Sequence, residues 1–299
     1  TGWIPVNFQR ISSNSPISQL PIDPQNTTST KYYTYVAGGS WQLAVNMESQ
    51  KYIVQSAATN DYDPGLYVTG NNNGIAPFVG GLVGWWKFDD GNNTTTSDAS
   101  GNNNFGTWNG TSTTRYGVGK SGSSGMFVRE SRDYLSTFAN MSKAKNTISA
   151  WIKIGSSSTN TRGQQIFYSY PTTHYPSFII LEKSGQLYTY NAERNGVYDV
   201  GMNLGCPYSA NYSCVGAISA SQWVHVVVSH SGSSEIVYVN GVQTASRAYS
   251  GTGGITGQFR MGWAFWSYQD YFTGELDDVR LYNRAFSAAE VQALYNATK

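Results

Sequence analysis

The sequence predicts an all-β protein built as a two-sheet jelly-roll sandwich, and two observations carry this prediction. From residue 81 onward, short segments rich in β-branched and aromatic residues alternate with turns of Gly, Ser and Asn, a pattern typical of many short strands. The 299-residue chain has only 12% charged residues but 22 tyrosines, 9 tryptophans and 32 glycines. This composition favours a β-sandwich at an extracellular surface over a helical cytosolic protein.

Composition divides the chain into three parts. Residues 1–70 form a small β-region, and residues 71–80 are a linker by their content of Gly and Asn. Residues 81–299 carry the recurring short strands and are long enough for one large β domain. Within that domain Asn240-Gly241 marks the clearest tight hairpin.

The last strand is predicted over residues 275–282. A period of two places Asp277 on the same face as Val279 and Leu281. If that face lies in the core, Asp277 points inward. A buried carboxylate is costly without a partner, so Asp277 needs a cation or several hydrogen-bond donors.

One short C-terminal helix is predicted directly after this strand. Ser287 occupies the N-cap position, and Glu290 three residues later completes the pattern of a capping box. Phe286 and Val291 stand at the positions of a hydrophobic staple. Val291 and Leu294 then begin one apolar stripe, which predicts a helix that packs against the sandwich.

Four blocks in this order resemble the laminin-G-like, concanavalin-A-like jelly-roll domains of bacterial surface and secreted proteins. The blocks are residues 81–107, 147–153, 223–241 and 272–290, with Trp85-Trp86-Lys87-Phe88-Asp89 in the first. The resemblance covers roughly residues 81–299 and implies the concanavalin-A-like fold. It implies no particular ligand.

Residues 1–70 resemble the C-terminal β-region of type IV pilins and type II secretion pseudopilins. The resemblance rests on residues 21–26, on the tyrosine-rich strand candidate at 31–36, and on a second candidate at 41–48 joined to it by a glycine-containing hairpin. In that family a long hydrophobic helix precedes this region. The resemblance therefore implies other pilin subunits as partners, bound through a helix missing from these residues. An unrelated small β-extension is the alternative.

The jelly-roll resemblance also implies a structural calcium site. Asp89, Asp98 and Asp277 occupy positions that match the family, and the turn around Asp98 offers further backbone and amide oxygens. Ca²⁺ prefers six to eight such oxygen ligands. We therefore expect Ca²⁺ at these three acids. In the alternative, Asp277 accepts backbone N–H bonds while Asp89 and Asp98 cap turns.

Cys206 and Cys214 are the only two cysteines, and they lie close together in a loop-like segment. The pair has no His nearby and lacks the spacing of a redox dithiol. We expect a disulfide, which would stabilise the fold by about 2–3 kcal/mol on the chain-entropy model. A disulfide indicates an oxidising, extracytoplasmic setting.

Aromatic residues cluster in segments predicted as loops and half-exposed strands. Sugars bind by stacking on aromatic rings while amides and carboxylates bind their hydroxyl groups, although many of these aromatics must fill the core. The candidate ligand-binding residues are Trp266, Tyr268, Gln269, Asp270, Tyr170 and Tyr190.

Catalysis is not expected. Glucanases of the same architecture use paired acids spaced Glu-x-Asp-x-x-Glu, and the nearest stretch, residues 275–280, has Arg280 in place of the second Glu. His225 lies within an apolar strand and is interpreted as a hydrogen-bonded core residue, whereas His174 and His230 resemble strand-end or loop residues. No nucleophile elbow, phosphate loop or histidine-rich metal motif is present.

The net charge of +1, without a basic run, excludes an electrostatic footprint for nucleic acid or anionic lipid. No apolar run approaches the roughly 20 residues of a membrane span. We therefore expect a non-catalytic binding or adhesion module, extracellular or at the bacterial cell surface, with a glycan or a cell-surface partner. The alternatives are a structural pilus subunit without ligand binding and a glycan-cleaving enzyme.

Overall fold

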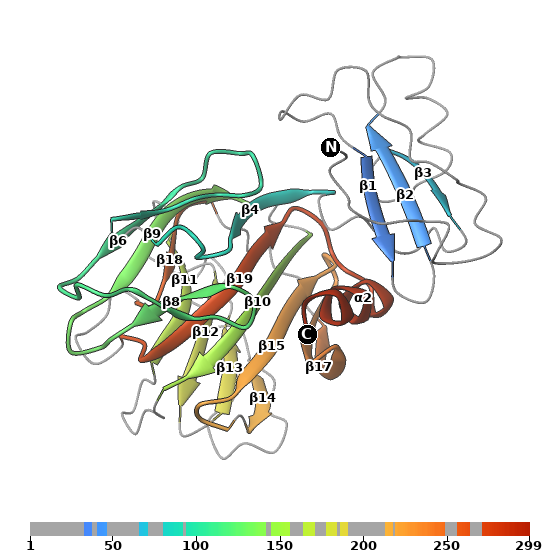
Figure 1. Cartoon of the computed structure of the whole chain (residues 1–299). Coiled ribbons are helices and arrows are strands. Elements are labelled where there is room, and N and C mark those ends of the chain that lie inside the picture. The colour runs from blue at the N-terminus through green and yellow to red at the C-terminus, as the bar shows by residue number, and fades with distance from the viewer. Residues whose placement is uncertain are drawn as a thin grey trace.

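The computed structural model describes residues 33–37, 41–46, 66–70, 80–91, 94–141, 145–155, 164–170, 178–183, 186–190, 213–217, 219–248, 256–263 and 271–299. Within these ranges the chain forms two antiparallel sheets of eight strands, one three-stranded sheet and one short C-terminal helix (Figure 1). The predicted all-β sandwich is therefore confirmed. No described helix is long and apolar enough to cross a membrane.

The three-stranded sheet lies within the N-terminal region. It consists of β1 (Tyr33–Ala37), β2 (Trp41–Asn46) and β3 (Leu66–Gly70), all paired antiparallel in that order. The predicted hairpin between the first two strands is confirmed by their pairing. The resemblance to pilins stays a prediction, because most of residues 1–70 lie outside the described ranges.

Sheet I is organised around the last strand, β19. Its strand order is β17-β16-β15-β10-β19-β8-β7, with β4 also paired to β19. The bounds are β4 Leu82–Trp86, β7 Tyr116–Val118, β8 Ser123–Phe127, β10 Asn146–Ile154, β15 Trp223–His230, β16 Ser234–Val239, β17 Val242–Ala248 and β19 Gly274–Tyr282. Along one edge β19 pairs with β10; along the other its first half pairs with β8 and its second half with β4.

Sheet II covers the other side of the core, with strand order β14-β13-β12-β11-β18-β9-β6-β5. The bounds are β5 Thr95–Thr96, β6 Gly106–Asn109, β9 Tyr134–Asn140, β11 Gln164–Tyr170, β12 Phe178–Lys183, β13 Gln186–Tyr190, β14 Ser213–Ala217 and β18 Thr256–Met261.

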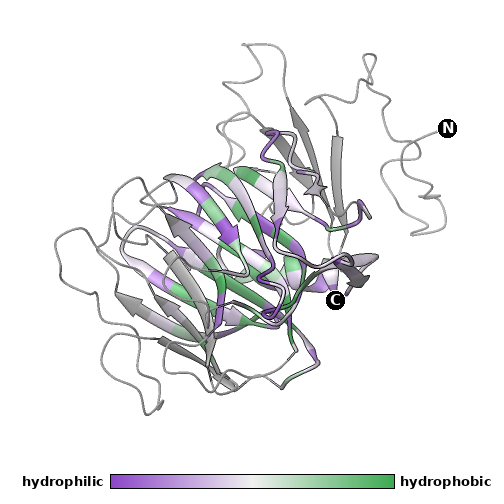
Figure 2. Cartoon of the chain, turned by 90° about the vertical axis from the view of Figure 1, so that its left-hand side faces the viewer, coloured by the Kyte–Doolittle hydropathy of each residue, from purple (hydrophilic) through white to green (hydrophobic). Residues whose placement is uncertain are grey.

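Apolar side chains of the two sheets meet in one core. Hydrophobic and hydrophilic residues alternate along the strands, as expected where one face of each sheet is buried (Figure 2). The ring of Trp86 in β4 stacks on Phe259 in β18 at 6.1 Å, and Phe259 stacks on Phe167 in β11 at 5.7 Å. Aromatic stacking therefore joins the two sheets across the sandwich.

Helix α2 (Ala288–Thr298) packs on the outer face of sheet I. The predicted capping box is confirmed, since the Ser287 side chain accepts from the Glu290 N–H and the Glu290 side chain accepts from the Ser287 N–H. Phe286 and Val291, predicted as a staple, are buried together with Leu294 against strands β15, β16 and β19.

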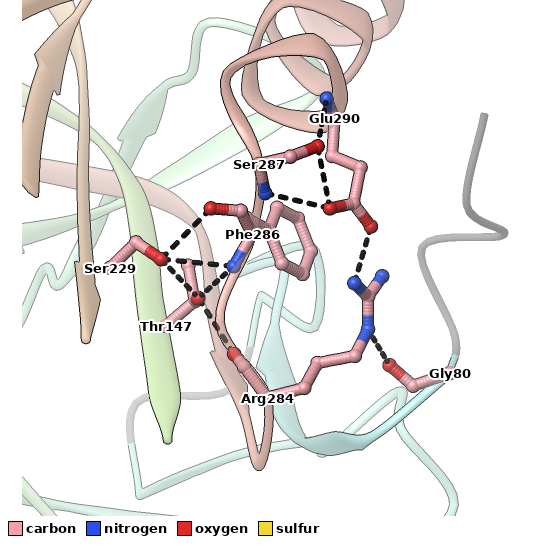
Figure 3. A network of polar contacts seen from close by, with 7 residues as sticks. All are labelled: Gly80, Thr147, Ser229, Arg284, Phe286, Ser287 and Glu290. Carbon is pink, nitrogen blue, oxygen red and sulfur yellow. Dashed lines mark hydrogen bonds and ion pairs between the residues drawn. The ribbon is translucent and has the colours of Figure 1, made fainter. Parts of the chain in front are cut away.

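A polar network ties the start of α2 to the sandwich (Figure 3). The hydroxyl groups of Thr147 in β10 and Ser229 in β15 both accept from the Phe286 N–H, at 3.0 and 2.9 Å. The Arg284 guanidinium forms an ion pair with Glu290 and donates from Nε to the Gly80 carbonyl at 2.9 Å. Arg284 therefore joins the segment just before β4 to the final helix.

The expected inward orientation of Asp277 is wrong, because a β-bulge interrupts β19. Ser149 of β10 pairs with Arg280 and Trp151 pairs with Asp277, so a step of two residues on β10 corresponds to three on β19. Asp278 lies in this interval with a φ of 49°. A bulge of this kind shifts the alternation by one residue.

The shift sends Asp277 to the outer face of the sheet. Leu276 and Val279, which flank the two acids, both belong to the core. Asp277 instead lines a pocket together with Trp151 and Arg280. It is nevertheless only 2% exposed, so the expectation that its carboxylate needs a partner holds.

Candidate functional site

Two regions on opposite outer faces of the sandwich gather polar and aromatic side chains and are candidate sites. The first, the β19 pocket, encloses about 340 Å³ on the outer face of sheet I. Strands β4, β10 and β19, the turn between β7 and β8, and the end of α2 all contribute to it. The lining residues are Trp85, Lys87, Asp89, Lys120, Ser121, Trp151, Asp277, Asp278, Arg280, Ala297, Thr298 and Lys299.

Asp277 forms the wall of the pocket nearest the β7–β8 turn. Its Oδ2 accepts a hydrogen bond of 3.0 Å from the backbone N–H of Ser121. Burial raises the pKa of the Asp277 carboxyl to about 7, against the opposing effect of this N–H bond. Near neutral pH the pocket therefore contains a carboxyl group that changes charge readily.

Asp278 and Arg280 neutralise each other at the floor of the pocket. The Arg280 guanidinium donates to both Asp278 oxygens, from Nε at 3.0 Å and Nη2 at 2.9 Å. The Trp85 indole N–H also donates to Asp278. The Arg280 guanidinium lies 4.3 Å from the Trp85 ring centroid, which adds a cation–π contact.

The predicted calcium ligands do not form one three-acid cluster. Asp89 and Asp277 line the same pocket, but Asp98 does not. The Asp98 carboxylate instead accepts three backbone N–H bonds of 2.9 Å, from Trp85, Ser100 and Asn104. Within the described part of the chain, no group of three or more His, Cys, Asp or Glu side chains could hold a metal ion.

This geometry supports the alternative in which the acids hold turns. Asp89 accepts from the Ser123 N–H at 2.8 Å, and Asp277 accepts from Ser121, so both hold the β7–β8 turn. Backbone carbonyls can also bind Ca²⁺. Calcium binding by Asp89, Asp98 and Asp277 therefore stays a prediction.

The second region is the outer face of sheet II around β9 and β18, which we call the β9–β18 face. In β9 the alternation places Leu135 in the core and leaves Phe138 68% exposed. Phe138 pairs in register with Gln258 of β18, and Ser136 pairs with Arg260. Phe105, just before β6, is 54% exposed.

An aromatic group borders the β9–β18 face. Trp263 stacks on Tyr271 with centroids 5.2 Å apart, and its ring also contacts Tyr134 at 4.9 Å. The Arg260 guanidinium lies 4.8 Å from the Trp263 centroid, and its Nη2 donates to the Gln258 side chain at 2.7 Å. The face therefore combines exposed aromatic rings with amide and guanidinium groups.

Of the predicted ligand-binding residues, Tyr170 occupies a register position beside this face, whereas Tyr190 lies three strands away from β18 in the same sheet. Tyr170 of β11 pairs in register with Gln258 of β18. Tyr190 of β13 pairs with Ile179 of β12, which pairs with Tyr168 of β11. Tyr168 in turn pairs with Arg260 of β18. Trp266, Tyr268, Gln269 and Asp270 lie outside the described residues, three positions or more after Trp263.

The predicted disulfide between Cys206 and Cys214 stays a prediction. Cys214 lies in β14, but Cys206 is outside the described residues. Titration of the native protein with a thiol reagent tests the bond, and two reactive thiols would contradict it.

Sequence reasoning missed Phe138 and its neighbours. The signal was available: residues 134–140 alternate so that Phe138 falls on the same side as Ser136 and opposite Leu135. A large apolar residue on the polar side of a strand indicates either a covered face or a contact surface.

The two histidines within the described residues, His225 and His230, are buried and have side-chain partners. His225 is 1% exposed and its Nε2 lies 2.9 Å from the Ser149 hydroxyl, which confirms its interpretation as a hydrogen-bonded buried residue. His230 ends β15 as predicted, but it is buried, with Nε2 2.6 Å from Glu235 and Nδ1 2.8 Å from Asn146. His174 lies outside the described residues.

Three solved structures illustrate what the fold is similar to. Domain 4 of AbnA, an extracellular GH43 arabinanase from Geobacillus stearothermophilus, aligns over 72% of this chain and 98% of that domain, with TM-score 0.54 and 21% identity. The binding domain of Paraclostridial Mosquitocidal Protein 1 aligns over 74% of this chain, with TM-score 0.55 and 17% identity. The binding domain of botulinum neurotoxin serotype C1 aligns over 75% of this chain, with TM-score 0.56 and 13% identity.

These likenesses show a shared fold. The alignments span only 53% of the two toxin binding domains. No curated protein matches the sequence. A family model described as "Concanavalin A-like lectin/glucanases superfamily" matches residues 129–292, more than half of the chain. On this evidence, the chain belongs to the concanavalin A-like lectin/glucanases superfamily.

Proposed function

We propose that the chain is an extracellular, non-catalytic carbohydrate-binding module that binds its ligand on the β9–β18 face. The observation that carries the proposal is the exposure of Phe138 beside Gln258 and Arg260. Large apolar side chains in the middle of a polar sheet face indicate a contact surface. A ring with the side-chain amide of Gln258 beside it matches the C–H faces and hydroxyl groups of a sugar.

The structural neighbours support a binding role. Domain 4 of AbnA was solved in complex with arabinotriose, and cell entry of botulinum neurotoxin type C depends on interaction with two ganglioside molecules. Both proteins share this fold and bind glycans. We therefore extend the proposed ligand class to oligosaccharides displayed on a polymer or a cell surface.

Display on a pilin-like filament is the second part of the proposal. It is supported by the resemblance of residues 1–70 to pilin β-regions and by the presence of a small antiparallel sheet there. A leader and an apolar helix of about 20 residues upstream of Thr1 in the full-length gene product would support it. A different domain upstream would contradict it.

The binding role is tested with a glycan array that includes arabino-oligosaccharides and gangliosides. We expect the 299-residue chain to bind at least one glycan, and Phe138→Ala to weaken that binding about tenfold or more, the loss expected for a contact worth 1.4 kcal/mol or more. Val242→Ala is the matched control, because Val242 is also exposed, at 63%, but lies in β17 of sheet I. Trp266→Ala tests the predicted loop in the same assay.

Three outcomes would contradict the proposal. Silence on the array, together with unchanged cell-surface adhesion of Phe138→Ala and Trp266→Ala, would favour a structural subunit. Equal losses for Phe138→Ala and Val242→Ala would remove the β9–β18 face as the site. Release of reducing ends from polysaccharides would identify an enzyme.

A further inference from the structure

We propose that the β19 pocket is a second binding site, specific for an acidic saccharide: a sugar unit that carries a carboxylate. The pocket lies on the outer face of sheet I and shares no residue with the β9–β18 face on sheet II. The inference therefore goes beyond the proposed function and stands on different side chains.

The pocket has the size of a site for a small ligand. Its volume of about 340 Å³ is at the lower end of the roughly 300–1,000 Å³ of small-molecule sites. Part of its wall is held in place, because Trp151 and Asp277 are at most 3% exposed and Trp151 donates from its indole N–H to the Thr298 hydroxyl at 3.1 Å. A pocket of this volume with a buried base and lysines along its lining suits one or two sugar units.

Of the three lysines that line the pocket, Lys299 donates to the Asn296 side chain at 2.9 Å, whereas Lys87 and Lys120 have no carboxylate partner among the described residues. The ammonium groups of Lys87 and Lys120 lie 4.2 and 4.8 Å from the ring centroids of Trp85 and Trp151. Neither lysine forms an ion pair with another described residue, in contrast to Arg280, which Asp278 neutralises. Both positive charges are therefore available to an anionic ligand.

The remaining polar groups select against a bare inorganic anion. Asp89 and Asp277 also line the pocket, and their oxygens accept hydrogen bonds that a fully ionised inorganic anion cannot donate. The same carboxylates can accept hydrogen bonds from hydroxyl groups, as can the Ser121 hydroxyl. A ligand with one carboxylate and several hydroxyl groups satisfies both sets of partners, and a sugar acid has this chemistry.

The proposal is tested by calorimetric titration of the 299-residue chain with digalacturonic acid and with sialyllactose, in EDTA and at low salt. Lactose is the neutral comparison and inorganic phosphate the simple anion. We expect one or both acidic saccharides to bind, and salt to weaken the binding. Lys87→Gln and Lys120→Gln should each lower affinity about tenfold, the loss expected when a hydrogen bond to a charged group is removed.

Lys153→Gln is the matched control. Lys153 lies in β10 of the same sheet and pairs with Glu275 at 2.8 Å, but it does not line the pocket. Val242→Ala, at an exposed residue of sheet I that does not line the pocket, should leave acidic-saccharide binding unchanged. Unchanged thermal unfolding of the lysine variants shows that the fold is retained.

Four results would overturn the proposal. They are equal binding of lactose, phosphate binding as tight as that of the saccharides, binding that requires added Ca²⁺, and the absence of binding by either acid. A loss of affinity in Lys153→Gln as large as in Lys87→Gln would also overturn it, because the effect would then be one of net charge.

Discussion

The carboxylate of Asp277 in β19 accepts a hydrogen bond of 3.0 Å from the backbone N–H of Ser121, in the turn between β7 and β8. This bond joins the last strand of the sandwich to a turn 156 residues earlier in the chain. It also keeps the most deeply buried acid of the β19 pocket beside a donor. The stability of the domain should therefore respond to the charge of this one carboxyl group.

We expect Asp277→Asn to change the pH dependence of stability. The folded state holds the Asp277 proton up to about pH 7, whereas the unfolded chain releases it near 3.8. Stability from this group is therefore fully present below about pH 4 and is lost as the pH rises through 7. The melting temperature of Asp277→Asn relative to the unsubstituted protein should rise between pH 5 and pH 8, measured in EDTA.

His225 supplies the opposite trend in the same protein. Burial lowers its pKa from 6.5 to about 3, so its contribution to stability is lost as the pH falls from about 6.5 toward 3. In Asp277→Asn this trend is no longer opposed, and stability should fall more steeply on acidification. A pH profile identical to that of the unsubstituted protein would contradict the assigned environment of Asp277.

Gly122→Ala should destabilise the domain through a clash with Asp89. Gly122 has a φ of +67°, and a Cβ there would lie 2.3 Å from an Asp89 oxygen. Gly91→Ala is the matched control, because Gly91 has a φ of +62° but no atom within 4 Å of a Cβ. We expect about 1–2 kcal/mol for Gly91→Ala from backbone strain and a larger loss for Gly122→Ala, by urea denaturation. Equal losses would show that Asp89 does not restrain the turn.

Arg284→Ala should destabilise the fold strongly, and more than the removal of a partly exposed ion-pair partner does. Glu290 is fully buried, and removing its cation leaves a buried charge, a change that costs about 3–5 kcal/mol. Lys153→Ala is the comparison, because the Lys153–Glu275 pair is 29% and 18% exposed and such pairs contribute about 0–1 kcal/mol. Chemical denaturation measures both. Similar losses for the two variants would mean that the Arg284 network adds little.

The calcium prediction is tested with thermal unfolding in EDTA and in added Ca²⁺. If the acids bind the ion, a concentration 100 times the dissociation constant should stabilise the fold by about 2.7 kcal/mol. Asp98→Asn should reduce this gain, whereas Asp90→Asn, at a neighbouring acid outside the predicted set, should not. An unchanged melting temperature together with the absence of metal by elemental analysis would reject the site.

Local signals in the sequence predicted local structure well. The Ser287–Glu290 capping box lies within one helical turn, and the hairpin at Asn240-Gly241 needs only the positive φ values of 50° and 81° that these two residues adopt readily. Both features depend on neighbouring residues alone. The sequence therefore contains all the information that they require.

Features set by distant partners were harder to predict. The bulge at Asp278 arises where β19 pairs with β10, a strand about 130 residues earlier in the chain. Because of this bulge, Asp277 lies on the face opposite to the one that the alternation predicted. The Glu235 carboxylate reaches both His230 and the Thr189 hydroxyl of the opposite sheet, a contact that no spacing indicates. Lys87 and Lys120 likewise come to line the same β19 pocket only after the fold is complete.

The position of β19 determines when the domain can fold. β4 and β19 pair residues that are 200 positions apart, Leu82 with Tyr282, and β8 and β10 need the same strand. Chain closure over such distances is slow, and none of these three strands can complete its pairing before the ribosome has synthesised β19, which starts at residue 274. A nascent chain stalled before residue 274 should therefore remain open to proteases, while a chain whose residues 274–299 have also left the ribosome should be resistant.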